Sequence, residues 1–397
     1  MRNKIIIAAL TVAALGCSGN ESTGPNGGTR QLDPQLVAQG KEIFRFDTFG
    51  DEVYWTDTLR MHEVIATGVS PRTALTVGLK VDSDALPDAV KSAIAAGQVN
   101  LDDPATTVTL LKLNAVVGVK GTVENVGGTD RLTRVGITCA LCHSTVDNSF
   151  APGIGKRLDG HANRTLNVGA IVALSPAVNA QLKQILNSWG PGKYDPRINF
   201  DNKNTPIVIP PAFGLRDVAK ETFTGEGPVS YWNAYVAVTQ MHGQGSFTDN
   251  RLGVNLVRSP DLVTSKLPAL SEYQFSLAAP APPAGSFDAA AAERGRTVFN
   301  GTGRCATCHL PAASFTDINT GKLHEPSETG MSAAYAERTT QKKYRTTPLK
   351  GLWQHPPYFH DGSAATVEAV IAHYDQTLSL GLSAQQKADL AQYLKSL

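Results

Sequence analysis

The pentapeptide "CALCH" at residues 139–143 recurs with one letter changed as "CATCH" at residues 305–309. In each copy, two cysteines stand three positions apart and a histidine follows the second cysteine directly. Two thiols at this spacing can bond both vinyl groups of a haem, and the next residue can then present its imidazole to the iron. The sequence therefore predicts two covalently attached c-type haems, each with its own proximal histidine. The residues predicted to hold them are Cys139, Cys142, His143, Cys305, Cys308 and His309.

Two other kinds of site use paired cysteines. A zinc ribbon would pool both pairs in one tetrahedral site, and a thioredoxin-like dithiol would follow a buried strand. Zinc needs no histidine directly after the second cysteine, and we expect neither motif to follow a buried strand. The repeated histidine favours haem over both alternatives.

The chain begins "MRNKIIIAALTVAALGCSGN", with Arg2 and Lys4 ahead of an apolar run that is too short to span a bilayer. This pattern predicts an export signal peptide over residues 1–16. The residues before Cys17 resemble the bacterial lipobox, which implies a lipidated Cys17, a membrane anchor, a flexible tether over residues 17–32 and a location in the periplasm. An ordinary secretory signal cleaved near Cys17 is the alternative.

The charge balance bears on the partners of the exported protein. The chain has 36 basic and 35 acidic residues, and the two basic residues in the signal peptide leave 34 against 35. Such a balance argues against nucleic acid as a partner.

Sequence matches outside the two motifs indicate a tandem duplication, because they occur in the same order in both halves. The paired segments are "GKEIF" (40–44) with "GRTVF" (295–299), "PAFGLRDVAKETFTG" (211–225) with "PLKGLWQHPPYFHDG" (348–362), and "LSEYQFSL" (270–277) with "LAQYLKSL" (390–397). The proline-rich "APAPPAGS" at 279–286 predicts a linker between an N-terminal domain, 33–278, and a C-terminal domain, 287–397.

The first domain is the larger. The offset between equivalent positions falls from 255 at the first match to 166 at the cysteine motif, which places an insertion at about 46–134. β-Branched residues at 77–81 and 116–123, with glycines nearby, predict a small hairpin or loop element there.

The ends of the second domain, Phe287–Phe299 and Ser383–Leu397, have the apolar spacing of helices. Short helices around such a motif resemble the class I cytochrome c fold, in which the first and last helices cross over the haem. We therefore expect a mainly α protein of two tandem class I cytochrome c-like haem domains, the first enlarged by an insertion.

Residues 344–375, "YRTTPLKGLWQHPPYFHDGSAATVEAVIAHYD", resemble the C-terminal haem domain of bacterial dihaem cytochrome c peroxidases and MauG. In those families the sixth ligand of this haem lies on the helix after the "PYFHDG" turn. The resemblance implies Tyr374 as the distal iron ligand, with His373 as its competitor. The alternative is that Tyr374 belongs to a buried helix stripe without binding iron.

In the peroxidases the first haem binds peroxide and is opened by movement of a histidine-bearing loop. His161, in "RLDGHANRT", stands at about that place and is a candidate distal ligand and catalytic group, although a lone loop histidine is as often structural. Met241 and His242 are rival ligands. Gln240 and His242 complete the candidate catalytic set.

The chain also departs from the peroxidase pattern. The family's "FWDG" turn appears here as residues 223–225 without tryptophan, and no acidic residue lies between Glu226 and Asp249, where the peroxidases carry a glutamate. Peroxide cleavage needs a proton carrier. The related rubber oxygenases activate dioxygen in an apolar pocket with little acid–base machinery. Trp189, Trp232 and Trp353 are either packed aromatics or electron relays.

Together these features predict a dihaem oxidoreductase that resembles cytochrome c peroxidase. A small periplasmic cytochrome or copper protein would donate electrons through the C-terminal haem to the N-terminal haem, where peroxide or dioxygen is reduced. A homodimer, as in the peroxidases, is a further expectation. The alternative function is a non-catalytic electron carrier with two six-coordinate haems.

Overall fold

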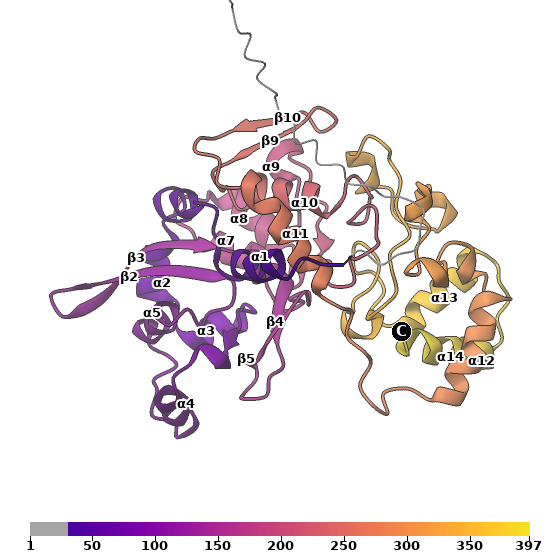
Figure 1. Ribbon diagram of the computed structural model, residues 1–397, viewed down its shortest axis with the longest axis horizontal. Helices are drawn as coiled ribbons and strands as arrows, with labels where there is room; N and C mark the ends of the chain where they lie inside the picture. The colour runs from indigo at the N-terminus through magenta and orange to yellow at the C-terminus, as the bar shows by residue number, and fades with distance from the viewer. Residues whose placement is uncertain (1–30) are drawn as a thin grey trace, which may run out of the picture. The chain divides into compact units, whose positions relative to one another are not determined.

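Short helices make up most of the regular structure in residues 31–397, the part of the chain that the computed structural model describes (Figure 1). Each sheet in this part is a pair of strands. The helix-rich architecture agrees with the predicted mainly α class. The signal peptide, Cys17 and nearly all of the tether lie outside the described residues. Within residues 31–397, no helix is both long and apolar enough to cross a membrane.

The bounds of the elements are as follows. The α-helices are α1 Pro34–Phe46, α2 Met61–Gly68, α3 Pro71–Thr76, α4 Asp88–Ala95, α5 Pro104–Lys112, α6 Ala140–His143, α7 Val168–Ala173, α8 Ala180–Asn187, α9 Ile198–Asp201, α10 Val229–Tyr235, α11 Leu267–Ser276, α12 Ala289–Asn300, α13 Val367–Thr377 and α14 Ala384–Lys395. The strands are β1 Val81–Asp82, β2 Val119–Val126, β3 Thr129–Ile137, β4 Ser144–Val146, β5 Ile154–Gly155, β6 Arg157–Asp159, β7 Lys193–Tyr194, β8 Ile207–Val208, β9 Ser246–Asp249 and β10 Val254–Val257. Two π-helical turns, η1 Val53–Thr58 and η3 Val236–Gln240, and several 3₁₀ turns complete the set.

Helix α1 crosses helix α11 at a glycine. A Cβ atom on Gly40 would lie 1.9 Å from the carbonyl oxygen of Ala269, so the two backbones can approach this closely only because residue 40 has no side chain. Beside the crossing, the rings of Phe44 and Tyr273 pack edge to face with their centroids 5.4 Å apart.

Helices α12 and α14 repeat this crossing in the second half of the chain, where Figure 1 shows them side by side. A Cβ atom on Gly295 would lie 2.0 Å from the carbonyl oxygen of Asp389. The rings of Phe299 and Tyr393 pack edge to face at 5.2 Å. The positions that the sequence pairs therefore make the same contacts in both halves.

The starts of the two crossing pairs also agree in detail. Asp33 caps α1 and Asp288 caps α12, and each carboxylate accepts a hydrogen bond from the first turn of its helix. The backbone N–H of Asp33 donates to Glu272 on α11 at 2.7 Å, and that of Asp288 donates to Gln392 on α14 at 2.9 Å.

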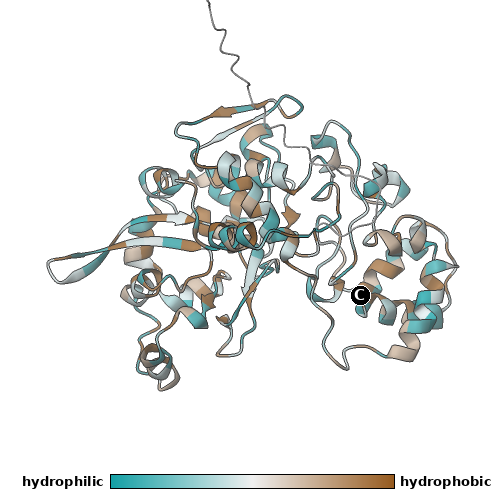
Figure 2. Ribbon diagram, viewed as in Figure 1, coloured by the Kyte–Doolittle hydropathy of each residue, from teal (hydrophilic) through white to brown (hydrophobic). Residues whose placement is uncertain are grey.

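The two predicted helices of the second domain are confirmed to within a few residues. Helix α14 begins after Ser383, whose hydroxyl accepts from the backbone N–H of Gln386. Polar and apolar residues share these helices (Figure 2), and Phe299 and Leu390 are among the apolar residues that they bury. Residues 277–288, which include the predicted linker, form no helix or strand.

The chain between α1 and the first motif contains more structure than the predicted small hairpin or loop. The hairpin exists, since β2 and β3 pair antiparallel around Gly127 and Gly128, whose φ angles are +61° and +85°. Four helices, α2 to α5, also lie there. Their start signals were missed: Ser70 and Asp103 cap α3 and α5, and a proline follows each cap.

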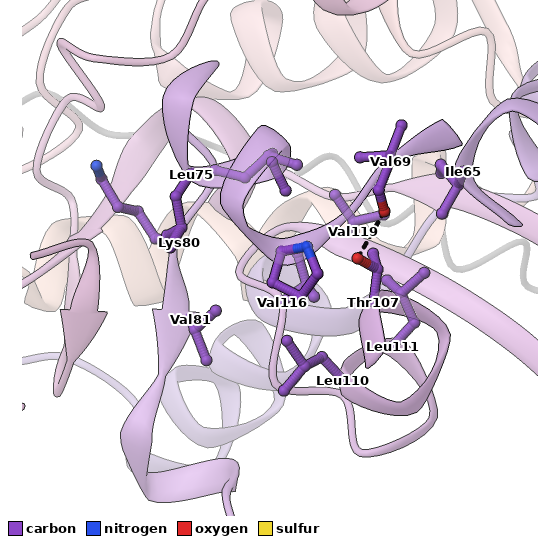
Figure 3. Close-up of a pocket in the computed structure, with 13 residues that line it drawn as sticks. Ile65, Val69, Leu75, Lys80, Val81, Thr107, Leu110, Leu111, Val116 and Val119 are labelled. Carbon is purple, nitrogen blue, oxygen red and sulfur yellow. Dashed lines mark hydrogen bonds between the residues drawn. The ribbon is translucent and has the colours of Figure 1, made fainter. Parts of the chain in front are cut away.

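Helices α2, α3 and α5 of this segment pack around a small cavity of about 40 Å³ with an almost entirely apolar wall (Figure 3). The polar side chains at its edge have hydrogen-bond partners: the Thr107 hydroxyl donates to the Val69 carbonyl at 2.7 Å, and the Lys80 ammonium donates to Thr165 at 2.7 Å. Val119, in the same wall, packs against the apolar cluster that contains Leu141 of the first motif. The segment therefore supports the first motif directly.

Candidate haem-binding site

Both cysteine–histidine motifs border one cavity of about 570 Å³, which brings residues 139–143 and 305–309 together. All six residues predicted to attach and ligate the haems lie in its wall. The four cysteines carry free thiols, and burial raises the pKa of Cys139 and Cys142 to about 12 and that of Cys305 to about 11.

The cysteines do not gather at one point. Within residues 31–397, the one group of three or more metal-ligand atoms that lie close together is Cys308 with Asp317 and His324. A zinc ribbon would need all four sulfurs within a single tetrahedron. The arrangement therefore does not support the pooled zinc site.

The first proximal histidine, His143, is oriented by a backbone carbonyl. Its Nδ1 lies 3.0 Å from the carbonyl oxygen of Pro210, which makes Nδ1 the protonated nitrogen and leaves Nε2 as the free electron pair. Burial lowers the pKa of His143 to about 4, so the ring is neutral near pH 7. A neutral imidazole held through Nδ1 is the usual form of a haem ligand.

The second proximal histidine, His309, is oriented in the same way. Its Nδ1 lies 3.0 Å from the carbonyl oxygen of Phe315, and burial lowers its pKa. The two motifs therefore share the supporting hydrogen bond as well as the sequence.

Several buried polar atoms in residues bordering the cavity lack hydrogen-bond partners. They include Nε and Nη1 of Arg164 and Nε of Arg345. Burial lowers the pKa of Arg164 to about 10, and Arg345 is paired with Glu221 at 3.1 Å. Both guanidinium groups border the cavity, and a guanidinium is a suitable partner for the propionate carboxylates of a haem. The polar groups of the wall thus fit haem.

Tyr374 on α13 borders the cavity, whereas His373 does not. Tyr374 is half-buried, and desolvation of its phenol raises its pKa to about 12. His373 instead lies with its Nε2 2.8 Å from the carbonyl oxygen of Thr329. Of the two predicted ligands, Tyr374 is therefore the one placed at the cavity, and its binding to iron stays a prediction.

The candidates for the first haem are spread more widely. His161 does not border the cavity; its ring lies against Phe213 at 5.3 Å, and its buried Nδ1 has no partner. His242 stacks on Tyr54 at 3.6 Å, also away from the cavity wall. Their ligand and catalytic roles remain predictions, and the geometry places neither histidine at the cavity.

The other two candidates, Gln240 and Met241, lie nearer to the cavity. Gln240 accepts a hydrogen bond from the hydroxyl of Tyr194, and Tyr194 borders the cavity. Met241 itself borders the cavity and is 2% exposed. Of the four candidates for the first haem, Met241 alone has direct access to it.

The loop that carries His161 is held on both sides. The backbone N–H of Asn163 donates to the carbonyl of Cys142 at 2.9 Å, and its side-chain amide donates to the carbonyl of Gly78 at 2.9 Å. A Cβ atom on Gly78 would lie 2.0 Å from the carbonyl oxygen of Thr165. The enlarged first segment thus clamps this loop against the motif.

Comparison of two helices shows residues that the sequence reasoning missed. Each helix begins shortly after a turn that the sequence pairs, and each turns one face to the cavity at the same spacing. The bordering residues are Val367, Val370, Ile371 and Tyr374 on α13, and Val229, Trp232, Asn233 and Val236 on α10 and the first residue of η3. Counted from the first bordering residue of each helix, Val236 corresponds to Tyr374 in the second half.

The three tryptophans have different surroundings. Trp189 donates its indole N–H to Asn204 at 2.8 Å, and Trp353 donates to the carbonyl of Pro280 at 3.1 Å, as expected of packed aromatics. Trp232 borders the cavity, is 8% exposed, and its Nε1 has no hydrogen-bond partner.

Comparison with known proteins finds similarity to a curated relative and to solved structures. No family model matches the chain. The methylamine utilization protein MauG of Methylorubrum extorquens is 29% identical over 129 residues, which cover 27% of this chain and 34% of that protein. The chain thus spans about a third of the length of this relative.

Among solved structures, hydrazine synthase of Kuenenia stuttgartiensis has a TM-score of 0.35 at 18% identity, covering 49% of this chain and 73% of that one. A MauG-like protein associated with microbial copper homeostasis has a TM-score of 0.34 at 19% identity, covering 49% and 74%. The relationship to MauG confirms the resemblance to the dihaem cytochrome c peroxidase and MauG superfamily, and it supports haem at the level of the superfamily.

Proposed function

We propose that this chain, a relative of the dihaem cytochrome c peroxidases and MauG, is an exported dihaem c-type oxidoreductase. It would take electrons from a small periplasmic cytochrome or copper protein and reduce peroxide or dioxygen. The support is the pair of motifs on one cavity, with matching hydrogen bonds behind His143 and His309.

The residues divide the work between two sites. Cys139, Cys142 and His143 would hold one haem, and the equivalent residues at 305, 308 and 309 would hold the other. Bound haems would supply electron transfer between the sites and reduction of the oxidant at the first. Arg164 and Arg345, which border the cavity, would neutralise propionates.

The observation that carries the proposal is a difference between the two halves: Tyr374 borders the cavity in the second half, and Val236 is its counterpart in the first. A phenol can ligate iron, and an aliphatic side chain cannot. In the first half, the helix that would supply a sixth ligand therefore supplies none at the matching position. An oxidant needs such an open position, and the asymmetry supports the haem on His143 as its place in this proposal.

Met241 favours the alternative function of a non-catalytic electron carrier. Its side chain is buried at the cavity wall, and a methionine thioether is a common sixth ligand of electron-transfer haems. If Met241 were the sixth ligand of the first haem and Tyr374 that of the second, both haems would be six-coordinate.

Electron paramagnetic resonance on the purified holoprotein, fully oxidised and then reduced by one electron, separates the two functions. A high-spin ferric signal in either state supports the oxidoreductase. Low-spin signals alone in both states contradict it and support the carrier. A Met241→Leu variant identifies the closing ligand: a high-spin signal that appears only in this variant assigns the sixth position to Met241.

Export and lipid anchoring form a separate part of the proposal. The anchor would be the modified Cys17, so a Cys17→Ser variant should move from the membrane fraction to the soluble periplasmic fraction. An unchanged membrane fraction would contradict anchoring at this residue.

A further inference from the structure

The carbonyl groups that orient the two proximal histidines come from different distances along the chain. His309 is oriented by Phe315, which lies six residues later in the same loop. His143 is oriented by Pro210, which lies 67 residues further on. The first proximal histidine therefore depends on a remote segment of the chain that must itself be held in place.

Pro210 directly follows a short hairpin, residues 192–209, which we call the support hairpin. Its strands β7 and β8 pair antiparallel and have two residues each, and helix α9 lies in the loop between them. At the open end, the backbone N–H of Ile209 donates to the carbonyl of Gly192 at 2.9 Å. A two-stranded hairpin of this size is hardly stable alone. Its position must therefore be fixed by contacts with other parts of the protein.

The carboxylate of Asp195 closes the loop of the support hairpin from inside. It accepts hydrogen bonds from the backbone N–H of Arg197 at 3.0 Å and from that of Thr205 at 2.8 Å, one on each side of the loop. The side chain of Asp195 has no exposed surface. A carboxylate so deeply buried needs a cationic partner.

Arg338, from the C-terminal half of the chain, is that partner. Its Nη1 lies 2.9 Å from Oδ2 of Asp195, and its Nε and Nη2 lie 2.7 Å and 2.8 Å from the two carboxylate oxygens of Asp201. Nη1 also donates to the hydroxyl of Thr205. The guanidinium is fully buried, and its planar fork fixes a geometry that the ammonium of a lysine cannot reproduce. Arg338 therefore holds the loop of the support hairpin from the other half of the chain.

A second contact from the same half lies nearer to Pro210. The backbone N–H of Val208 donates to the carbonyl of His360 at 2.8 Å. A Cβ atom on Gly362 would lie 2.9 Å from Cγ1 of Val208, so the "PYFHDG" turn packs closely against this strand. The C-terminal half thus contacts the support hairpin both at its loop and two residues before Pro210.

We infer that Arg338 is a positioning residue for the first haem site, because it holds the support hairpin so that the Pro210 carbonyl accepts from Nδ1 of His143. The inference rests on the proposed function and adds a means by which the C-terminal half regulates the first site. A proximal imidazole that donates to a fixed acceptor is a more basic ligand and stabilises ferric iron. Displacement of the carbonyl should therefore raise the potential of the first haem.

Arg338→Lys tests the inference in the full-length holoprotein, since it keeps the positive charge and removes the fork. Potentiometric titration followed by electron paramagnetic resonance separates the haems, because under the proposed function only the first has a high-spin ferric signal. At a fixed applied potential, we expect the ratio of ferrous to ferric iron at the first haem to rise about tenfold, which is about 59 mV for one electron. The potential of the second haem should not change.

Hydrogen exchange measured by mass spectrometry tests the link between Arg338 and the support hairpin without a haem signal. The amides of Thr205, Val208 and Ile209 are hydrogen-bonded in the wild type and should exchange faster in Arg338→Lys. A shifted potential with unchanged exchange at these amides would contradict a route through the hairpin.

The matched control is Arg294→Lys. Arg294 forms a similar two-pronged pair with Asp389, at 3.0 Å and 2.7 Å, within the C-terminal half. This variant should change neither the potential of the first haem nor exchange in the support hairpin.

The outcomes separate the inference from the proposed function. An unchanged first potential in Arg338→Lys overturns the inference and leaves the proposed function standing. Equal shifts at both haems also overturn it, because Arg338 would then support the protein as a whole. Wild-type protein without a high-spin ferric signal refutes the proposed function. Absorbance titration then decides the inference, which predicts a shift of one low-spin haem and not of both.

If Arg338→Lys does not take up haem, Asp201→Asn decides. Asp201 is 30% exposed, and the pair between Arg338 and Asp195 stays in place in this variant. The ratio of ferrous to ferric iron at the first haem should rise about threefold, as expected for loss of a partly exposed ion pair. No change at the first haem would overturn the inference.

Discussion

Helix α13 and the segment formed by α10 and η3 each line the cavity with four residues at the same spacing. The last of these four residues is Tyr374 on α13 and Val236 in the other segment. The crossing helices around them are alike down to the glycine and the aromatic pair. The two halves thus agree where they pack and differ where a ligand would bind. A π-helical turn begins at Val236, and such turns are frequent at functional sites.

Replacing Val236 by tyrosine should have the largest effect, because it would give both halves a phenol at the cavity. Val236→Tyr places a phenol at the open position, and we expect loss of the high-spin ferric signal and of nearly all oxidant turnover. Val236→Phe is the matched control, since it adds the same ring without the oxygen. If the tyrosine variant keeps its high-spin signal, the match between residues 236 and 374 is wrong.

Gly40 and Gly295, the glycines at the two helix crossings, should contribute equally to the stability of the protein. Gly40→Ala and Gly295→Ala each push a methyl group into a backbone carbonyl, so each should lower the free energy of unfolding by about 3 kcal/mol, the upper end of overpacking costs. Urea denaturation measures both. The control is Gly68→Ala in α2, where nothing lies within 4 Å of the added atom and stability should not fall. Clearly unequal losses at 40 and 295 would show that the crossings are not equivalent.

Removing the second ligand tests the other side of the comparison. Tyr374→Phe keeps the aromatic ring and removes the phenol oxygen. As an iron ligand, that oxygen would stabilise the ferric state. The potential of the haem on His309 should rise by about 100 mV, a fraction of the roughly 0.8 V that axial ligands span. Potentiometric titration followed by absorbance gives the value. An unchanged potential would assign Tyr374 to a buried helix stripe.

The smallest effect concerns pH and a pair of arginines. Arg345 contacts Glu221, and Arg164 lies near Tyr358, the residue that the sequence pairs with Glu221. Burial raises the pKa of Glu221 to about 7, so the folded state binds this proton more tightly than the unfolded state does. Stability should therefore fall as pH rises from about 4.5 through 7, by at most about 3 kcal/mol for a shift of this size.

Urea denaturation at several pH values measures that slope, and Glu221→Gln should reduce it. Tyr358→Phe is the matched control in the other half, because Tyr358 is uncharged throughout this range. A slope that is the same in wild type and Glu221→Gln would mean that another group titrates.

The sequence predicts the two motifs, the order of the repeats and the helices at 287–299 and 383–397, because each rests on local spacing. It does not predict the helices between residues 61 and 112, whose caps are short signals beside conspicuous β-branched runs. Nor does it find Val236, because the correspondence with Tyr374 appears only when the cavity shows which helix faces are equivalent. Placement of His161 and His242 depends on tertiary packing and could not be judged from loop position.

The hydrogen bonds that close the two helix crossings span very different lengths of chain. Asp33 and Glu272 are 239 residues apart, whereas Asp288 and Gln392 are 104 residues apart. Closing the longer loop costs more chain entropy, by about 0.6 kcal/mol for each doubling of length. Long-range contacts of this kind also slow folding. The C-terminal half can close as soon as its own short loop forms, and the N-terminal half must hold its first helix unpaired until most of the chain exists. The first motif therefore stays accessible longer during folding, which leaves more time for haem attachment there.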